Sequence, residues 1–242
     1  MPRLYRELKE LRGMVIRMGQ LNEFEPPESV KKFLAAVGRK DPVFRINPKT
    51  SALLVIDMQR DFLCEGAPLE GYKCRDIVPN VKKLIEYARK KDIPVIWAIH
   101  VHSPHGGDMG LMEDMWPKTG PKGGGLVKGK DGAKIYDELP KPLDSEVVIE
   151  KHRYSAFFQT DLEIHLRTLG VDTLMITGMH TNICCQTTAR DGFMRDFKIV
   201  FVSDGVASFT PELHKAGLVD IAVAFGRVIS SAEIIKEIES SS

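Results

Sequence analysis

ALLVID, residues 52–57, is a short run of apolar residues that ends in an acidic one. Five later segments share its apolar character and are rich in Val and Ile: IPVIWAI (93–99), EVVIE (146–150), DTLMITG (172–178), KIVFVS (198–203) and GRVIS (226–230). Runs of this length and composition are typical of strands that are covered on both faces by helices. The sequence therefore predicts six buried strands.

Amphipathic helices are expected between these strands. After the first strand, four apolar residues recur at positions i, i+3, i+4 and i+7: Val81, Leu84, Ile85 and Ala88. This spacing places them on one helical stripe that packs on the sheet. Because strands and helices alternate along the chain, the crossovers should be right-handed. The sequence predicts a three-layer α/β/α fold around a six-stranded, mostly parallel sheet.

The composition is typical of one soluble domain. The 242 residues are 43% hydrophobic and carry a formal net charge of +1. This length allows one large core, which we assign to residues 46–242, and the charge implies neither nucleic acid nor a membrane as a partner. The start, MPRLYRELKELRGMVIRMG, lacks the uninterrupted apolar stretch of a signal peptide, and no later stretch is long enough to span a bilayer. We expect a cytoplasmic protein.

Residues 1–45 form an extension of different character. They lean basic, contain the Pro26-Pro27 break and include a predicted short helix around Ser29–Val37. Two interpretations are open: an arm that packs on a partner subunit or covers the site, and a surface decoration of the chain's own domain. The second is simpler and is favoured.

Three reactive side chains stand at the ends of predicted strands. Asp57 ends ALLVID, Lys151 follows EVVIE, and Cys184 follows DTLMITG and the turn-prone GMHTN, at the start of a helix predicted to run to about Arg195. The carboxyl ends of parallel strands meet at one edge of the sheet, so we expect these groups to lie together. Singly, each has an ordinary interpretation: a loop hydrogen-bonder, a solvated lysine and a small buried apolar residue.

Cys184 is the expected nucleophile. Four cysteines, two of them adjacent, make a poor disulfide framework, and we interpret Cys64, Cys74 and Cys185 as small core residues. At a helix start, unpaired amides and the helix dipole favour a thiolate and offer hydrogen bonds to an oxyanion. A thiol, a carboxylate and an amine together suffice for acyl transfer.

Three motifs of the chain, ALLVIDMQRDF, KHRYSAF and GMHTNICCQTTARD, resemble those of the isochorismatase-like cysteine hydrolases in order and spacing. This family includes nicotinamidase, N-carbamoylsarcosine and ureidoacrylate amidohydrolases, and isochorismatase itself. The resemblance covers about residues 48–235. It implies the family's fold, a small-molecule substrate, a homo-oligomer and no required cofactor.

The resemblance also implies a role for each site residue. Asp57 is expected to be the general base, Lys151 the cation beside it and Cys184 the attacking sulfur. Met179-His180 falls where the family has a cis peptide bond, which would turn the amides of His180 and Cys184 toward one point as an oxyanion hole. The implied reaction is hydrolysis of a C–N bond through a thioester.

Further residues are candidates for the substrate pocket, for a metal site or for a loop over the centre. Five aromatic residues are candidates for the substrate pocket, with packing in the core as the more usual role for most of them: Phe62, Trp97, Trp116, Tyr154 and Phe157. Nicotinamidases carry an Asp-x-His pair for a metal, whereas this chain has His100 and His102 there, so either a divalent ion or two polar loop residues is possible and no metal is assigned. Gly124–Lys130 matches G-x-x-x-x-G-K but lacks the following Ser or Thr and a leading strand, so we interpret it as a loop or a lid.

Three functions remain open from the sequence. The first is an amidohydrolase of a small amide, ureido or carbamoyl compound. The second is an isochorismatase-type vinyl-ether hydrolase, since MRDFKIVFVSDGVASFTPE and LMEDMW also resemble that branch. The third is a non-catalytic binding module. The combination of Asp57, Lys151 and Cys184 favours the first.

Overall fold

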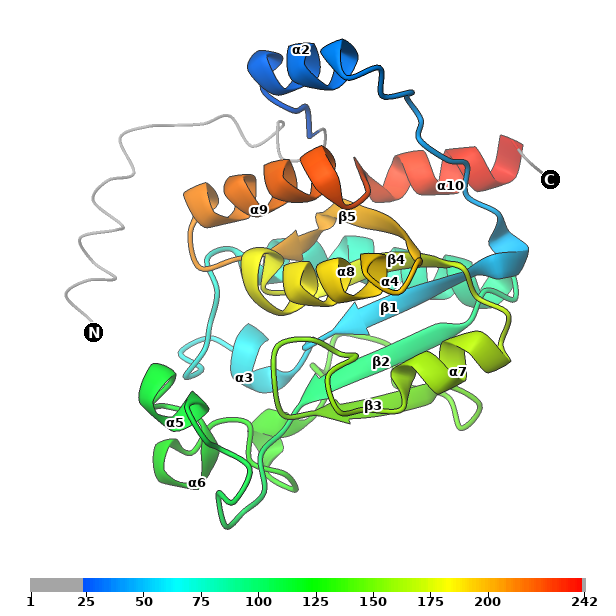
Figure 1. Cartoon of the computed structure of the whole chain (residues 1–242). Coiled ribbons are helices and arrows are strands. Elements are labelled where there is room, and N and C mark those ends of the chain that lie inside the picture. The colour runs from blue at the N-terminus through cyan, green and yellow to red at the C-terminus, as the bar shows by residue number, and fades with distance from the viewer. Residues whose placement is uncertain (1–23, 241–242) are drawn as a thin grey trace.

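The computed structural model describes residues 24–240 and contains a parallel sheet (Figure 1). Its strands are β1 (Ser51–Ile56), β2 (Val95–His100), β3 (Val147–Lys151), β4 (Thr173–Met179), β5 (Lys198–Ala207) and β6 (Arg227–Ile229). They are ordered β3-β2-β1-β4-β5-β6, and every neighbouring pair is parallel. The six predicted strands are confirmed, although the edge strands β3 and β6 are only partly buried. The sheet is entirely parallel because a helix or a long connection separates successive strands.

Helices cover both faces of this sheet. The longer ones are α4 (Val78–Lys90), α7 (Leu162–Thr168), α8 (Gln186–Phe193), α9 (Pro211–Ala224) and α10 (Ser231–Ser240). Leu53 and Val55 point to one face, where they share a buried cluster with residues of α4 and α10. Leu54 and Ile56 point to the other, toward α7, α8 and α9. The predicted three-layer α/β/α fold is confirmed.

The predicted apolar stripe of the crossover helix lies in the core. In α4, Val81, Leu84, Ile85 and Ala88 are all buried, whereas Lys82 is exposed. Burying one large aliphatic side chain contributes about 1.5–3 kcal/mol, so this helix is held mainly by its contact with the sheet.

Short helices lie beyond the carboxyl ends of the strands. These are α3 (Arg60–Leu63), α5 (Met112–Met115) and α6 (Gly120–Gly123). In Figure 1 the arrows of β1 and β2 run toward the side of the molecule where these helices lie. The connections at this edge therefore supply the walls of the site.

The described part of the extension is tied to the chain's own domain. The helix predicted around residues 29–37 is α2 (Glu28–Ala36), which has no buried residue. After it, the Arg39 guanidinium donates hydrogen bonds to the carbonyls of Ala222, Val223 and Gly226 at 2.6, 2.9 and 3.1 Å. These carbonyls lie at the end of α9, so Arg39 caps that helix.

The sequence also raised the question of membrane segments. Within residues 24–240, no helix combines the length and the apolar character that crossing a bilayer requires. The segment at residues 1–19, whose charge pattern argued against a signal peptide, lies outside the described residues.

Candidate active site

The carboxyl edge of the sheet brings the three predicted reactive groups together. Asp57 directly follows β1, Lys151 is the last residue of β3, and Cys184 lies in a π-helical turn, Thr181–Cys185, after β4. Lys151 Nζ donates a 2.8 Å hydrogen bond to Asp57 Oδ2, and both side chains are 0% exposed. A carboxylate oxygen of Asp57, Cys184 Sγ and a ring nitrogen of His100 all lie within 4.8 Å of one another.

Backbone geometry turns Asp57 into this centre. Its φ is +52°, in the left-handed region that Asp adopts more readily than most residues. Its amide still donates to the Ala98 carbonyl of β2 at 2.8 Å, so the turn begins immediately after the last ladder bond. The carboxylate therefore leaves the sheet at its edge rather than entering the core.

Burial controls the proton on the candidate nucleophile. Burial and the Asp57 carboxylate raise the pKa of the Cys184 thiol, and the Lys151 ammonium only partly opposes them. Burial thus favours the protonated thiol. Cys184 lies in a buried turn that leads directly into α8, so it stands at a helix start as expected, while burial opposes the thiolate that a helix start favours.

The two charged groups respond to each other. Burial raises the pKa of the Asp57 carboxyl, while the charge of Lys151 lowers it in part. Burial also lowers the pKa of the Lys151 amine, but Asp57 and Cys184 outweigh this effect and hold that pKa above its ordinary value. A cation is therefore fixed beside a carboxylate that can take up a proton.

The chain before Cys184 has an unusual backbone. Met179-His180 is a cis peptide bond, as the resemblance implied. The His180 carbonyl accepts hydrogen bonds from the amides of Ile183 and Cys185 at 3.0 and 3.2 Å. Just before the cis bond, Gly178 has a φ of +120°. It lies so close to β1 that a β-carbon would clash with the backbone carbonyl of Ile56. Only glycine fits there.

Cys184 lies on the wall of a small pocket of about 30 Å³, which is lined mainly by aromatic and aliphatic side chains. The rings of Trp116 and Phe209 stack at 5.4 Å between centroids, and Phe209 stacks on His180 at 3.9 Å. Phe62 meets His180 edge-on at 5.4 Å. Trp116 Nε1 donates to the Tyr154 hydroxyl at 3.0 Å, which fixes this wall.

Three of the five predicted pocket residues line this pocket, namely Phe62, Trp116 and Tyr154. The assignment of Trp97 and Phe157 to the pocket is wrong. Trp97 points from β2 into the core under α4 and donates to a Glu146 oxygen at 2.8 Å. Phe157 packs against Phe197 in the core on the other face. Both rings pack in the core, which is the usual role of aromatic residues.

Sequence reasoning missed Phe209 and the pocket position of His100. Phe209 lies between β5 and α9, in SFTP, which is a strand-to-helix connection at the carboxyl edge. That placement was the available signal. His100 was considered only as a metal ligand.

The glycine-rich segment forms part of the pocket wall. Thr119 and Leu126 line the pocket. The Leu126 amide donates to Asp61 Oδ2 at 2.6 Å, and the Leu126 carbonyl accepts from the His102 amide at 2.7 Å. These bonds hold the segment on α3 and on the end of β2. No described strand leads into Gly124–Lys130, which agrees with rejecting a phosphate loop.

One potential set of metal ligands is the reactive centre itself, Asp57, His100 and Cys184. Lys151 Nζ lies 2.8 Å from Asp57 Oδ2 and 3.4 Å from His100 Nδ1. Its positive charge already occupies the space between these groups, and a divalent cation beside it would be repelled. This set does not fit a metal.

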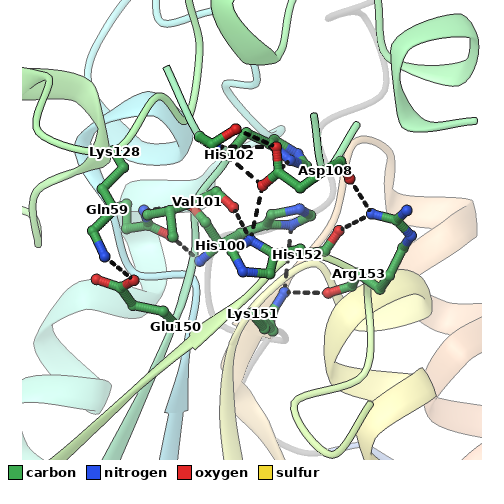
Figure 2. A network of polar contacts seen from close by, with 11 residues as sticks. Gln59, His100, Val101, His102, Asp108, Lys128, Glu150, Lys151, His152 and Arg153 are labelled. Atoms are coloured by element: carbon green, nitrogen blue, oxygen red, sulfur yellow. Dashed lines mark hydrogen bonds and ion pairs between the residues drawn. The ribbon is translucent and has the colours of Figure 1, made fainter. Parts of the chain in front are cut away.

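A second set consists of His102, Asp108 and His152, whose ligand atoms also lie within 4.8 Å (Figure 2). His102 is 0% exposed, its Nδ1 lies 3.5 Å from Asp108 Oδ2, and its Nε2 has no hydrogen-bond partner within the described residues. Two imidazoles and a carboxylate suit a divalent cation such as zinc. A cation there would tie the loop that carries Asp108 to the ends of β2 and β3, behind His100, whose ring packs against that of His102.

Comparisons with known proteins identify the family of the chain. The Isochorismatase domain family matches residues 51–233. A protein of Arabidopsis thaliana described as a probable inactive nicotinamidase is 38% identical over 72% of this chain and 88% of its own length. Nicotinamidase 3 of the same plant is 34% identical over 79% and 88%. The crystal structure of a cysteine hydrolase from Pseudomonas syringae pv. phaseolicola 1448A has a TM-score of 0.77 and 33% identity, over 82% of this chain and 97% of that one. The chain therefore belongs to the isochorismatase family, a family of hydrolases with amidohydrolases among its members.

Proposed function

We propose that the protein is a cysteine-dependent amidohydrolase, which cleaves the C–N bond of a small amide, ureido or carbamoyl compound through a thioester. The observation that carries this proposal is the contact of a buried carboxylate and ammonium with a thiol that lies on the wall of a pocket. The names of amidohydrolase relatives support it. The label of one relative as inactive makes direct assay the deciding step.

Asp57 is the proposed general base. Its Oδ2 is held by Lys151, while Oδ1 is buried and has no hydrogen-bond partner in the described part of the chain. Oδ1 can therefore accept the thiol proton as Cys184 Sγ bonds to the substrate's carbonyl carbon. This order suits a thiol that is neutral at rest, because the proton leaves only as the new bond forms.

The remaining steps follow from the same groups. As Sγ attacks, the carbonyl electron pair moves to oxygen, and we assign the amides of His180 and Cys184 to stabilise that oxyanion. The intermediate then expels the amine, which takes the proton from Asp57 and leaves as ammonia or a primary amine. A water molecule gives a proton to Asp57 and attacks the thioester, which releases a carboxylic acid and restores the Cys184 thiol. Lys151 remains a cation throughout.

The pocket favours an uncharged, flat substrate. Its walls are formed by Phe62, Trp116, Tyr154 and Phe209, and no Asp, Glu, Lys or Arg is among the described lining residues. A carboxylate entering this space would lose hydration without gaining a cation as partner. This observation weighs against the vinyl-ether alternative, because isochorismate carries two carboxylates.

The test is ammonia release from a panel of small amides and ureido compounds. Native protein is compared with Cys184→Ala. Cys185→Ala is the matched control, because the Cys185 thiol is buried at the adjacent position in the chain but does not line the pocket. We expect release by the native and Cys185→Ala proteins and none by Cys184→Ala. A trapped thioester on the peptide that contains Cys184, seen by mass spectrometry, would identify the nucleophile.

Other outcomes decide between the alternatives. Equal release by native protein and Cys184→Ala rejects Cys184 as the nucleophile. Isochorismate cleavage that survives Cys184→Ala but not Asp57→Asn supports the ether hydrolase. Ligand binding without turnover of either substrate class supports a binding module.

A further inference from the structure

His100 is a buried imidazole that the proposed mechanism does not use. It is the last residue of β2, is 2% exposed and lines the pocket beside Cys184. Its Nδ1 lies 3.4 Å from Lys151 Nζ, and Figure 2 draws this contact as a dashed line. Its Nε2 is buried and has no hydrogen-bond partner within residues 24–240. A buried polar atom without a partner costs free energy unless a ligand satisfies it.

The contact with Lys151 fixes the tautomer of this ring. An ammonium group can only donate hydrogen bonds, and that of Lys151 also donates to Asp57 Oδ2 at 2.8 Å and to the Arg153 carbonyl at 3.2 Å. The nitrogen of His100 that faces it must therefore present a lone pair. In a neutral imidazole the proton then lies on the other nitrogen, Nε2.

The charge state agrees with this assignment. A charged imidazolium has a proton on both ring nitrogens and would direct one of them at the Lys151 ammonium, so this contact excludes the charged form. The ring is therefore neutral, with one acceptor and one donor. Its donor is the unpartnered Nε2–H.

The ring is also held firmly in place. The Gln59 side chain accepts a hydrogen bond from the His100 amide at 2.8 Å and donates one to the His100 carbonyl at 2.9 Å. Gln59 Nε2 donates further to the Ala133 carbonyl at 2.8 Å. The His102 ring packs against that of His100, with 4.9 Å between centroids. A donor fixed this way is preorganised for one direction of approach.

We propose that His100 determines substrate specificity by donating a hydrogen bond from Nε2 to an acceptor atom of the substrate other than the attacked carbonyl oxygen. This inference rests on the proposed amidohydrolase function. It predicts that substrates with a second acceptor, such as a ring nitrogen or a second carbonyl, are favoured over analogues with C–H in that place. A site with a fixed donor discriminates against such analogues, because they leave the donor unpaired.

The first experiment uses matched substrates and variants. The substrate pair is pyridine-3-carboxamide and benzamide, with the 2- and 4-carboxamides of pyridine to locate the acceptor. His100→Leu removes the donor and His100→Gln retains one, while His105→Asn changes an exposed histidine of the same segment. We expect native protein to favour one pyridine amide in kcat/KM by about 10-fold, mainly through KM. His100→Leu should lose this preference, and His100→Gln and His105→Asn should keep it.

The second experiment does not depend on turnover. Long-range 1H–15N correlation NMR of the imidazole rings, assigned with His100→Gln, reports which nitrogen carries the proton. We expect Nε2–H in the free protein, and a shift of that nitrogen when the preferred pyridine amide binds to Cys184→Ala. A lone pair on Nε2, or its coordination of added Zn²⁺, would overturn the proposal. So would an equal loss of activity on every amide in His100→Leu, since that is the pattern of a structural defect.

The two experiments separate this inference from the proposed function. If no amide is hydrolysed but Nε2 is protonated and shifts with the pyridine amide, the amidohydrolase proposal fails and the donor role stands. If amides are hydrolysed without any preference for an acceptor, the donor role fails and the amidohydrolase proposal stands.

Discussion

The Lys151 ammonium lies 2.8 Å from Asp57 Oδ2, and neither side chain has any exposed surface. Two strands bring these residues together across β2, since Lys151 ends β3 and Asp57 follows β1. An ion pair without solvent is weak evidence for stability, because desolvation offsets the attraction between the charges. Its presence beside Cys184 is better explained by the chemistry that it supports.

Removing only one partner of this pair should be costly. We expect Lys151→Met to abolish hydrolysis and to lower the free energy of unfolding by about 3–5 kcal/mol, because it leaves Asp57 buried without a counter-charge. Urea denaturation measures the loss. The double variant Asp57→Leu with Lys151→Met should recover much of the stability and none of the activity. A double variant no more stable than Lys151→Met would contradict this account.

The raised pKa of Cys184 gives a prediction about pH. Because the thiol holds its proton more tightly than a free cysteine, less thiolate is present at a given pH. The rate of alkylation of Cys184 by iodoacetamide should therefore be low at neutral pH and rise by about tenfold per pH unit through the ordinary cysteine range, without a plateau. Peptide mass spectrometry follows the modification. Fast alkylation that levels off below neutral pH would indicate a resting thiolate instead.

Strand ends, rather than loops, are what the sequence predicts well in this molecule. Asp57 and Lys151 follow runs so apolar that their strands, and hence the shared edge, could be identified directly. The pocket walls could not, because they come from connections whose positions depend on contacts distant in sequence. Phe209 reaches the wall by stacking on His180. Leu126 is held there because its carbonyl accepts a hydrogen bond from the chain just after β2 and its amide donates one to α3. Trp97 was misplaced because an aromatic residue in a strand faces either side according to register alone.

Gly178 should be sensitive to a single methyl group. Its φ of +120° and the close approach of the Ile56 carbonyl both exclude a β-carbon, so we expect Gly178→Ala to destabilise the fold by more than about 2 kcal/mol. Gly66→Ala is the control, since Gly66 also has a positive φ but open space around it. Thermal and urea unfolding compare the two. Equal losses in both variants would show that the backbone angle, and not the contact with β1, sets the cost.

Substitution of the two tryptophans of the chain should affect different properties, namely substrate binding in one case and stability in the other. Trp116 stacks on Phe209 in the pocket wall, whereas Trp97 is buried in the core. We expect Trp116→Leu to raise KM for a hydrolysed amide by about 10-fold with little change in the unfolding midpoint. Trp97→Leu should lower the midpoint and leave KM nearly unchanged. A native KM in the Trp116→Leu protein would show that the aromatic wall does not contribute to substrate binding.

Chelation should leave catalysis intact, because Lys151 supplies the positive charge beside the nucleophile and the carboxylate. We expect ammonia release to be unchanged after dialysis against EDTA, and again after Zn²⁺ is restored. His102→Ala is the matched variant, since it removes the buried ligand of the set formed with Asp108 and His152, and His102 itself does not line the pocket, although its ring packs against that of His100. If EDTA or His102→Ala stopped the reaction and Zn²⁺ restored it in native protein alone, a metal on that set would be part of the site.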